Sequence, residues 1–186
     1  NGVKMFHLWN WWNSMLHLEF PNISYKSRYL DMMTAWKNTE ETPVSPRRLF
    51  AWESYEKFLQ IISEDMTANA WWANSTLFFF MDDDEILWAI QIRHHIDHPR
   101  LAPDGDGWGH IGYWLCPSAR GKWLAKEMLR LGLEEARKLW LEKVLISADE
   151  DNPASWKTIE RCGGVFDRMV WRERDQKNLK LYWIAL

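Results

Sequence analysis

The chain has 186 residues, 47% of them hydrophobic and 26% charged, a balance typical of a single globular domain. Its net charge of −3 argues against a nucleic-acid-binding protein, because such proteins usually carry a strongly basic face. The sequence contains no apolar run of about 18 residues, so it predicts no membrane-spanning helix. Two cysteines, Cys116 and Cys162, cannot form a disulfide framework and favour a reducing, cytoplasmic compartment.

Residues 1–14 lack the basic start and the small-residue cleavage site of a signal peptide. They hold three tryptophans without a helical or strand period. The pair Ser14-Met15 is typical of a cloning leader followed by an initiator methionine; the alternative is an N-terminal segment that packs on a neighbour. We therefore expect one domain over residues 15–186.

Hydrophobic periodicity predicts the elements in chain order. Alternating or continuously apolar stretches predict strands at 16–20, 76–81, 85–96, 110–116, 143–148, 165–174 and 179–185. Apolar positions at helical spacing predict helices at 25–37, from Ser54 to about 62, at 125–140 and at 152–162. The order β-α-α-β-β-β-α-β-α-β-β indicates an α/β fold, a mixed sheet with helices on both faces.

Several helix ends are marked by residues that typically cap or terminate a helix. Ser24 and Ser54 are expected to cap the first two helices. Asp151 or Asn152, followed by Pro153, predicts the start of the fourth helix, and the pair Gly163-Gly164 supplies its left-handed stop. Residues 97–109, rich in proline and glycine, are expected to form an exposed loop.

The most informative stretch is a strand, a short basic turn and a helix over residues 111–125. A helix N-terminus leaves backbone N–H groups unpaired and carries partial positive charge. Arg120 and Lys122 add full positive charge at that point, which suits a phosphate or pyrophosphate. The alternative is a solvated basic loop before an ordinary helix.

This stretch also resembles the cofactor loop of the GNAT superfamily of N-acetyltransferases, whose pattern is Gln/Arg-x-x-Gly-x-Gly/Ala. Four further segments are similar to the superfamily in the same order, at residues 85–94, 109–113, 151–155 and 162–165. The resemblance runs from Leu16 to Leu186 and points to a bacterial branch. It implies a mostly antiparallel, twisted sheet of about seven strands.

The resemblance implies an acyltransferase that moves the acetyl group of acetyl-CoA to a primary amine of a small molecule, amino acid or peptide. It implies direct attack by the amine, with no metal, nucleic-acid or membrane partner, and often a homodimer formed through the C-terminal strands. A backbone N–H at Leu115 or Cys116 would polarise the thioester. Asn152 and Ser155 would face the pantetheine arm. The pyrophosphate would bind at Arg120, Gly121, Lys122, Trp123, Leu124 and Ala125.

Tryptophan departs from the pattern of the superfamily. The chain has 15 tryptophans and 9 glycines, and Trp123 stands at the first glycine of the loop pattern. Other tryptophans also fall at glycine, small-residue or linker positions: Trp71, Trp72, Trp88, Trp108, Trp114 and Trp140. Three explanations remain open: an engineered variant, a sequence that differs from the true chain, or a natural pseudoenzyme.

The acid and the base of the reaction are open as well. Many relatives have a tyrosine on the fourth helix that acts as the general acid and protonates the leaving thiolate. Ile159 stands at that position here, so Tyr113 is the candidate general acid in its place. His110, with an ordinary pKa near ~6.5, is the candidate base. Glu85 and Glu150 are weaker candidates for that role.

Other polar groups favour simpler interpretations. His94, His95 and His98 spread along an extended stretch, so they are not expected to converge on a metal. Asp104 and Asp106 would attract a cationic amine or form a solvated turn.

Two functions compete with catalysis. One is a non-catalytic binding module on the same fold, with an impaired CoA site. The other is a carbohydrate-binding surface of stacked indoles, which the amphipathic helix over 125–140 disfavours.

Overall fold

The computed structural model describes residues 15–39, 41, 54–67 and 73–186. The expectations for residues 1–14 and for Trp71-Trp72 lie outside these residues. The helices are α1 (Lys26–Lys37), α2 (Tyr55–Thr67), α3 (Leu124–Lys138) and α4 (Pro153–Arg161), with short 3-10 turns η1 (Ile23–Tyr25) and η2 (Pro117–Ala119). The strands are β1 (Leu16–Glu19), β2 (Ser75–Asp82), β3 (Glu85–Arg93), β4 (Ile111–Leu115), β5 (Lys143–Asp149), β6 (Val165–Arg172) and β7 (Lys177–Ala185).

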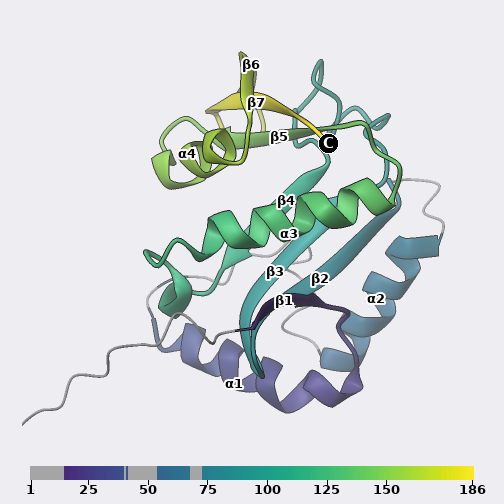
Figure 1. Cartoon of the computed structure of the whole chain (residues 1–186), viewed down its shortest axis with the longest axis vertical. Helices are drawn as coiled ribbons and strands as arrows, with labels where there is room; N and C mark the ends of the chain where they lie inside the picture. Colours follow the sequence, from purple (N-terminus) through teal and green to yellow (C-terminus); the bar gives the residue numbers. More distant parts are fainter. Residues whose placement is uncertain (1–14, 40, 42–53, 68–72) are drawn as a thin grey trace, which may run out of the picture.

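The first four strands form one antiparallel sheet in the order β1-β2-β3-β4. Helices α1 and α2 cover one face of it and α3 covers the other (Figure 1). On the α1–α2 face, the Phe79 ring stacks on Phe58 at 6.1 Å and lies 6.2 Å from Tyr29. On the other face, Gly132 lets α3 approach closely, because a Cβ there would lie 2.3 Å from Ile90 Cδ1. Burial on both faces explains the continuous apolar run of β2.

The last three strands form a second antiparallel sheet in the order β5-β7-β6, and α4 packs against it. The Tyr182 hydroxyl of β7 donates to Glu160 of α4 at 3.2 Å. The seven expected strands are therefore confirmed, divided between two sheets.

The two sheets meet at one point and then separate. Gly109, just before β4, forms an isolated bridge with Ile146 of β5. Its φ is +66°, and a Cβ there would lie 2.3 Å from the Leu145 carbonyl oxygen, so only glycine fits. Beyond this bridge β4 diverges from β5, and the gap opens toward the start of α3 (Figure 1).

Some local expectations need correction. Ser24 does not cap α1; instead Asn22 caps the preceding turn by accepting from the Ser24 amide at 3.0 Å. Ser54 does cap α2, with its hydroxyl accepting from the Lys57 amide at 3.0 Å. The loop over 97–109 is not wholly exposed, because Leu101 is fully buried.

Candidate active site

The edge of β4 that faces the gap carries backbone N–H groups directed away from β3. The Cys116 amide donates to Leu87 O at 3.0 Å, so it is already used within the sheet. Leu115 lies opposite Trp88, one residue before the hydrogen-bonded Cys116, and therefore belongs to a non-hydrogen-bonded pair of the antiparallel ladder. The amide of Leu115 is thus directed away from β3. Of the two amides considered from sequence, Leu115 is therefore the one directed into the gap.

The cofactor loop predicted from sequence lies at the start of α3. Gly121 and Trp123 both have positive φ, 74° and 64°, and Trp123 is the residue before the first helical turn. The amides of the first turn have no acceptor within the helix. Trp123 is 70% exposed, and its indole lies against the Arg161 guanidinium at 4.7 Å. The indole therefore leans toward α4, and the donor set at the helix start fits a pyrophosphate.

Arg120 connects this loop to α1. Its guanidinium donates to Leu115 O at 3.2 Å and to Glu41 Oε2 at 2.6 Å. It also lies 5.8 Å from the centre of the Trp36 ring. Arg120 therefore positions the loop through three contacts, and a phosphate would compete with Glu41 for it.

Tyr113 points across the gap toward α4. Its hydroxyl lies 3.0 Å from Ser155 Oγ and 3.2 Å from Ser155 O. Burial raises the pKa of Tyr113 to about 12, so the phenol keeps its proton at neutral pH. Asn152 accepts from the Ser155 amide at 3.2 Å and so caps α4. The structure thus brings Tyr113 and Ser155 together at the start of α4.

His110 has a different place from the one expected of a general base. Its Nδ1 accepts from the Leu145 amide at 2.9 Å, and its own amide donates to Leu145 O at 2.7 Å. Burial, with a smaller contribution from the Arg93 charge, lowers the pKa of His110 to about 4. An imidazole whose Nδ1 is engaged and whose proton affinity is low is a poor base. We interpret His110 as a structural residue that joins the two sheets through its two hydrogen bonds with Leu145, and we call this pair of bonds the His110 clamp.

The remaining histidines do not converge. His94 Nε2 lies 2.9 Å from the Thr76 hydroxyl, while His95 lies 3.3 Å from Asp97. His98 accepts from a backbone amide two residues later. Among the described residues, no group of three or more histidine, cysteine or acidic side chains is arranged to hold a metal.

Two of the acidic candidates are used within the fold. Asp104 forms an ion pair with Arg168 at 2.7 Å, which connects the loop over 97–109 to β6. Glu150 accepts from the Asn178 side chain at 3.0 Å. Neither Asp104 nor Glu150 is brought to the edge of β4.

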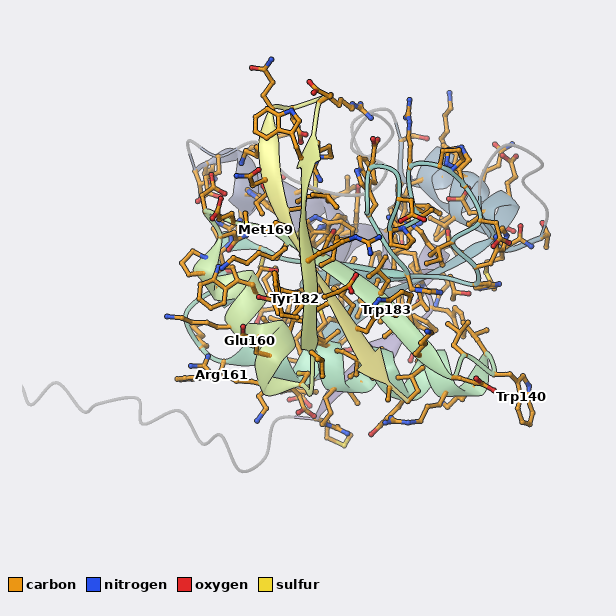
Figure 2. The ribbon with its side chains drawn as sticks, turned by 90° about the horizontal axis from the view of Figure 1, so that it is seen from above. Trp140, Glu160, Arg161, Met169, Tyr182 and Trp183 are labelled. Atoms are coloured by element: carbon orange, nitrogen blue, oxygen red, sulfur yellow. The ribbon has the colours of Figure 1, made fainter. Side chains whose placement is uncertain are left out.

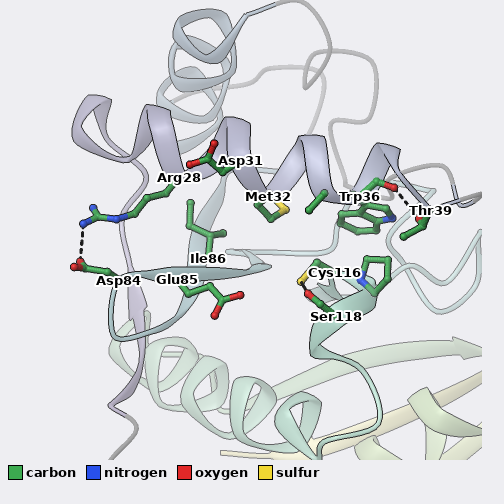
Figure 3. A pocket seen from close by; sticks show the side chains of 12 residues that line it. Arg28, Asp31, Met32, Trp36, Thr39, Asp84, Glu85, Ile86, Cys116 and Ser118 are labelled. Carbon is green, nitrogen blue, oxygen red and sulfur yellow. Dashed lines mark hydrogen bonds and ion pairs between the residues drawn. The ribbon is translucent and has the colours of Figure 1, made fainter.

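A cavity of about 360 Å³ lies between α1 and the adjoining ends of β3 and β4 (Figure 3). Trp36 and Met32 of α1 form one wall, and Cys116 forms part of the opposite wall. Its acidic side chains are Asp31, Asp84 and Glu85; Asp84 is paired with Arg28 at 2.9 Å. Within the described part of the chain, Asp31 and Glu85 form no hydrogen bond or ion pair through their side chains. Because Cys116 directly follows Leu115, the cavity adjoins the end of β4.

Sequence reasoning missed three residues of this region. Trp36 and Glu41 contact Arg120 from about 80 residues away in sequence, so no local pattern could reveal them. Arg93 is 3% exposed and donates to Gly109 O at 2.9 Å, beside the point where the sheets meet. The one available signal was its charge at the end of an apolar strand.

Comparison with known proteins agrees with this geometry. The family described as acetyltransferase (GNAT) domain matches residues 27–165, and the chain belongs to this family of acyltransferases. No curated protein sequence matches the chain. Within the described part of the chain, no helix is long and apolar enough to cross a bilayer.

Solved structures share the fold at low identity. RimL, a ribosomal-protein α-N-acetyltransferase in complex with coenzyme A, has a TM-score of 0.65 at 15% identity, covering 92% of this chain and 94% of that one. The microcin self-immunity acetyltransferase MccE, in complex with acetyl-CoA and AMP, has a TM-score of 0.63 at 18% identity, covering 91% of both chains. A spermidine N-acetyltransferase SpeG chimera from Vibrio cholerae and hSSAT has a TM-score of 0.61 at 15% identity, covering 91% of this chain and 94% of that one.

Proposed function

We propose that the protein transfers an acetyl group from acetyl-CoA to a primary amine by direct attack. The observation that carries this proposal is the separation of β4 from β5 beyond the Gly109–Ile146 bridge, which leaves the Leu115 amide directed away from β3 shortly before the start of α3. Two of the solved structures of similar fold contain acetyl-CoA or coenzyme A, which supports the same donor here.

Each residue then has a role that follows from its position. The amides at the start of α3, with Arg120 and Lys122, bind the pyrophosphate. The Leu115 amide donates to the thioester carbonyl oxygen, where negative charge develops during attack. Tyr113, which stays protonated, donates its proton to the departing thiolate. The acceptor loses one proton to water before it attacks as a neutral amine and a second as the amide forms, and solvent restores the proton of Tyr113.

The acceptor is a cationic amine of a small molecule, an amino acid or a peptide. The cavity supports this class, because Asp31 and Glu85 give it negative charge beside the apolar walls of Met32 and Trp36 (Figure 3). Named neighbours act on a polyamine and on a protein amine, which is compatible with either acceptor size.

Thermal melts with and without acetyl-CoA test donor binding first. Acetyl-CoA at about 100 times its dissociation constant stabilises by about 2.7 kcal/mol, which raises Tm by roughly 5–11 °C for a domain of this size. Lys122→Glu is expected to remove most of the shift, and Lys157→Glu, on the exposed side of α4, is the matched control. Amine-dependent release of free thiol then tests turnover.

A catalytically inactive module with an impaired CoA site is the second candidate. It is favoured by Trp123 at a glycine position and by the fully buried Ile159 where relatives have an acidic tyrosine. It predicts no thiol release with any amine, even if acetyl-CoA raises Tm.

We also propose a cytoplasmic homodimer formed through the C-terminal strands. β6 is an edge strand, and four of its apolar side chains are 43–70% exposed: Val165, Phe166, Met169 and Trp171. An apolar edge strand is a typical pairing surface. Sedimentation of the protein and of Met169→Lys tests this, with a monomeric variant as the expected result.

A further inference from the structure

Three tryptophans have a backbone conformation that side chains rarely adopt. Positive φ occurs at five non-glycine residues of the described chain, and tryptophan accounts for three of them: Trp88 at 133°, Trp123 at 64° and Trp140 at 61°. The other two, Asp83 and Gln176, lie in the turns of β-hairpins. Tryptophan supplies 15 of 186 residues, so its share of these positions is far above its share of the chain. Bulky residues are genuine outliers at positive φ.

Trp140 occupies the position after a helix where glycine is most enriched. The Trp140 amide donates to Arg137 O at 3.0 Å, and the Leu141 amide donates to Ala136 O at 3.4 Å. This pair of hydrogen bonds defines a Schellman motif, in which the residue after the C-cap is left-handed and is usually glycine. Trp140 is 92% exposed and projects from the end of α3 (Figure 2). Little packing therefore compensates the steric cost of its Cβ.

Trp123 lies in the cofactor loop and is the last residue before α3. It is left-handed two residues after Gly121, which is also left-handed. A side chain at this point crowds a ligand that approaches the amides of the first helical turn, and glycine leaves that approach open. The indole is 70% exposed and lies 4.7 Å from the Arg161 guanidinium.

Trp88 occupies an irregular position of β3. The register between β2 and β3 shifts here, with Phe80 opposite Trp88 and Met81 opposite Ile86, so β3 carries one extra residue. Glycine is a common residue in such bulges because it adopts positive φ. A φ of 133° lies beyond the left-handed helical region, where side chains other than hydrogen are strongly disfavoured.

We propose that the native protein carries glycine at positions 88, 123 and 140, because its cell decodes as glycine a codon that is read elsewhere as tryptophan. The codon UGA has both readings among variant genetic codes, so one decoding difference accounts for all three positions. Three unrelated local motifs, a bulge, a phosphate-binding loop and a helix C-terminus, each take glycine for their own steric reason. The proposal does not extend to Trp36 and Trp156, which lie inside helices and have no positive φ.

One consequence concerns the cofactor site, and it alone rests on the proposed function. With glycine at 123, the loop regains the glycine of the Gln/Arg-x-x-Gly-x-Gly/Ala pattern, and a pyrophosphate that binds at the helix start no longer has an indole beside it. The argument at Trp140 is independent of any ligand, because that residue lies at the opposite end of α3.

The direct test is peptide mass spectrometry of the protein purified from the cells that encode it. Cleavage after lysine isolates position 123 in the peptide 123–126 and position 140 in the peptide 139–143. Each peptide is expected to be lighter by the difference between an indolylmethyl group and a hydrogen atom. Native peptides that contain tryptophan at 123 and 140 would overturn the proposal.

Recombinant variants give a second, structural test. Trp140→Gly is expected to raise the folded-to-unfolded ratio about 2–10-fold over Trp140→Ala, because only glycine relieves the left-handed strain. Trp156→Gly, inside α4, is the control and is expected to lower the ratio. Trp123→Gly is expected to increase the acetyl-CoA-dependent rise in Tm more than Trp123→Ala. A stabilised Trp140→Gly without any acetyl-CoA response would uphold the glycine assignment and contradict the proposed function; an unstabilised Trp140→Gly would contradict the assignment itself.

Discussion

The clamp that His110 forms between the two sheets makes stability depend on pH in a defined direction. The native imidazole is buried and neutral, with its Nδ1 accepting from the Leu145 amide at 2.9 Å and its pKa lowered to about 4. In the unfolded chain the pKa returns to about 6.5, so the unfolded state binds the proton more tightly. The contribution of His110 to stability is therefore present above about pH 6.5 and is lost as the pH falls toward about 4.

The magnitude follows from the two pKa values. A difference of about 2.5 units corresponds to roughly 3 kcal/mol in full, of which about 2 kcal/mol is lost between about pH 7 and pH 5. For a domain of this size, that loss lowers Tm by about 4–8 °C. The matched variant is His110→Gln, whose side-chain oxygen can accept from the Leu145 amide but which does not titrate.

Urea unfolding of both proteins at several pH values isolates this contribution. The carboxylates titrate in both proteins and cancel in the difference between them. The stability advantage of the unaltered protein over His110→Gln is expected to shrink by about 2 kcal/mol from about pH 7 to pH 5. Parallel curves for the two proteins over that range would refute the clamp and would reopen the role of His110 as a base.

Three further predictions, each with its own control, test the site and the core. Tyr113→Phe is expected to lower kcat about 10²–10⁴-fold with acetyl-CoA affinity retained, as measured by steady-state kinetics and calorimetry; Ser155→Ala, which removes only the hydroxyl partner, is expected to retain most of kcat. Glu85→Gln is expected to raise KM for a cationic amine and to leave a neutral amine unaffected, and equal effects on both would contradict the cavity as an acceptor site. Gly132→Ala places a Cβ 2.3 Å from Ile90 Cδ1 and is expected to cost about 1–3 kcal/mol in chemical denaturation, with partial recovery when Ile90→Val is added.

Much of the fold follows from local sequence patterns. The continuous apolar run of β2 and the helical spacing of apolar residues in α3 were clear enough to identify one element as a strand and the other as a helix without tertiary information. Local signals also marked the ends of α4, because capping is a local interaction: of Asp151 and Asn152, Asn152 is the cap, and of the pair Gly163-Gly164, Gly163 has the positive φ. Ser24 misled the prediction, since a residue two positions earlier competes for the same role.

Of the candidate site, only the groups that the backbone supplies could be predicted from the sequence. The loop over 120–125 and the Leu115 amide belong to one continuous segment, so the order of residues places them. The direction of Tyr113 and the hydrogen bonds of His110 were not accessible, because each depends on a partner 35 or more residues away. Arg120 was expected to face a phosphate, and its contacts with Glu41 and Trp36 come from the tertiary structure alone.

The sequence by itself determined the kinds of elements, their order and the basic loop before α3, because periodicity, capping and charge are local properties. Only the tertiary structure decided which edge of β4 is open, which amide faces the gap and which histidine is a clamp. It also showed that Trp88, Trp123 and Trp140 have positive φ, since backbone conformation at a single residue is fixed by the motif around it and not by the residue's own preference.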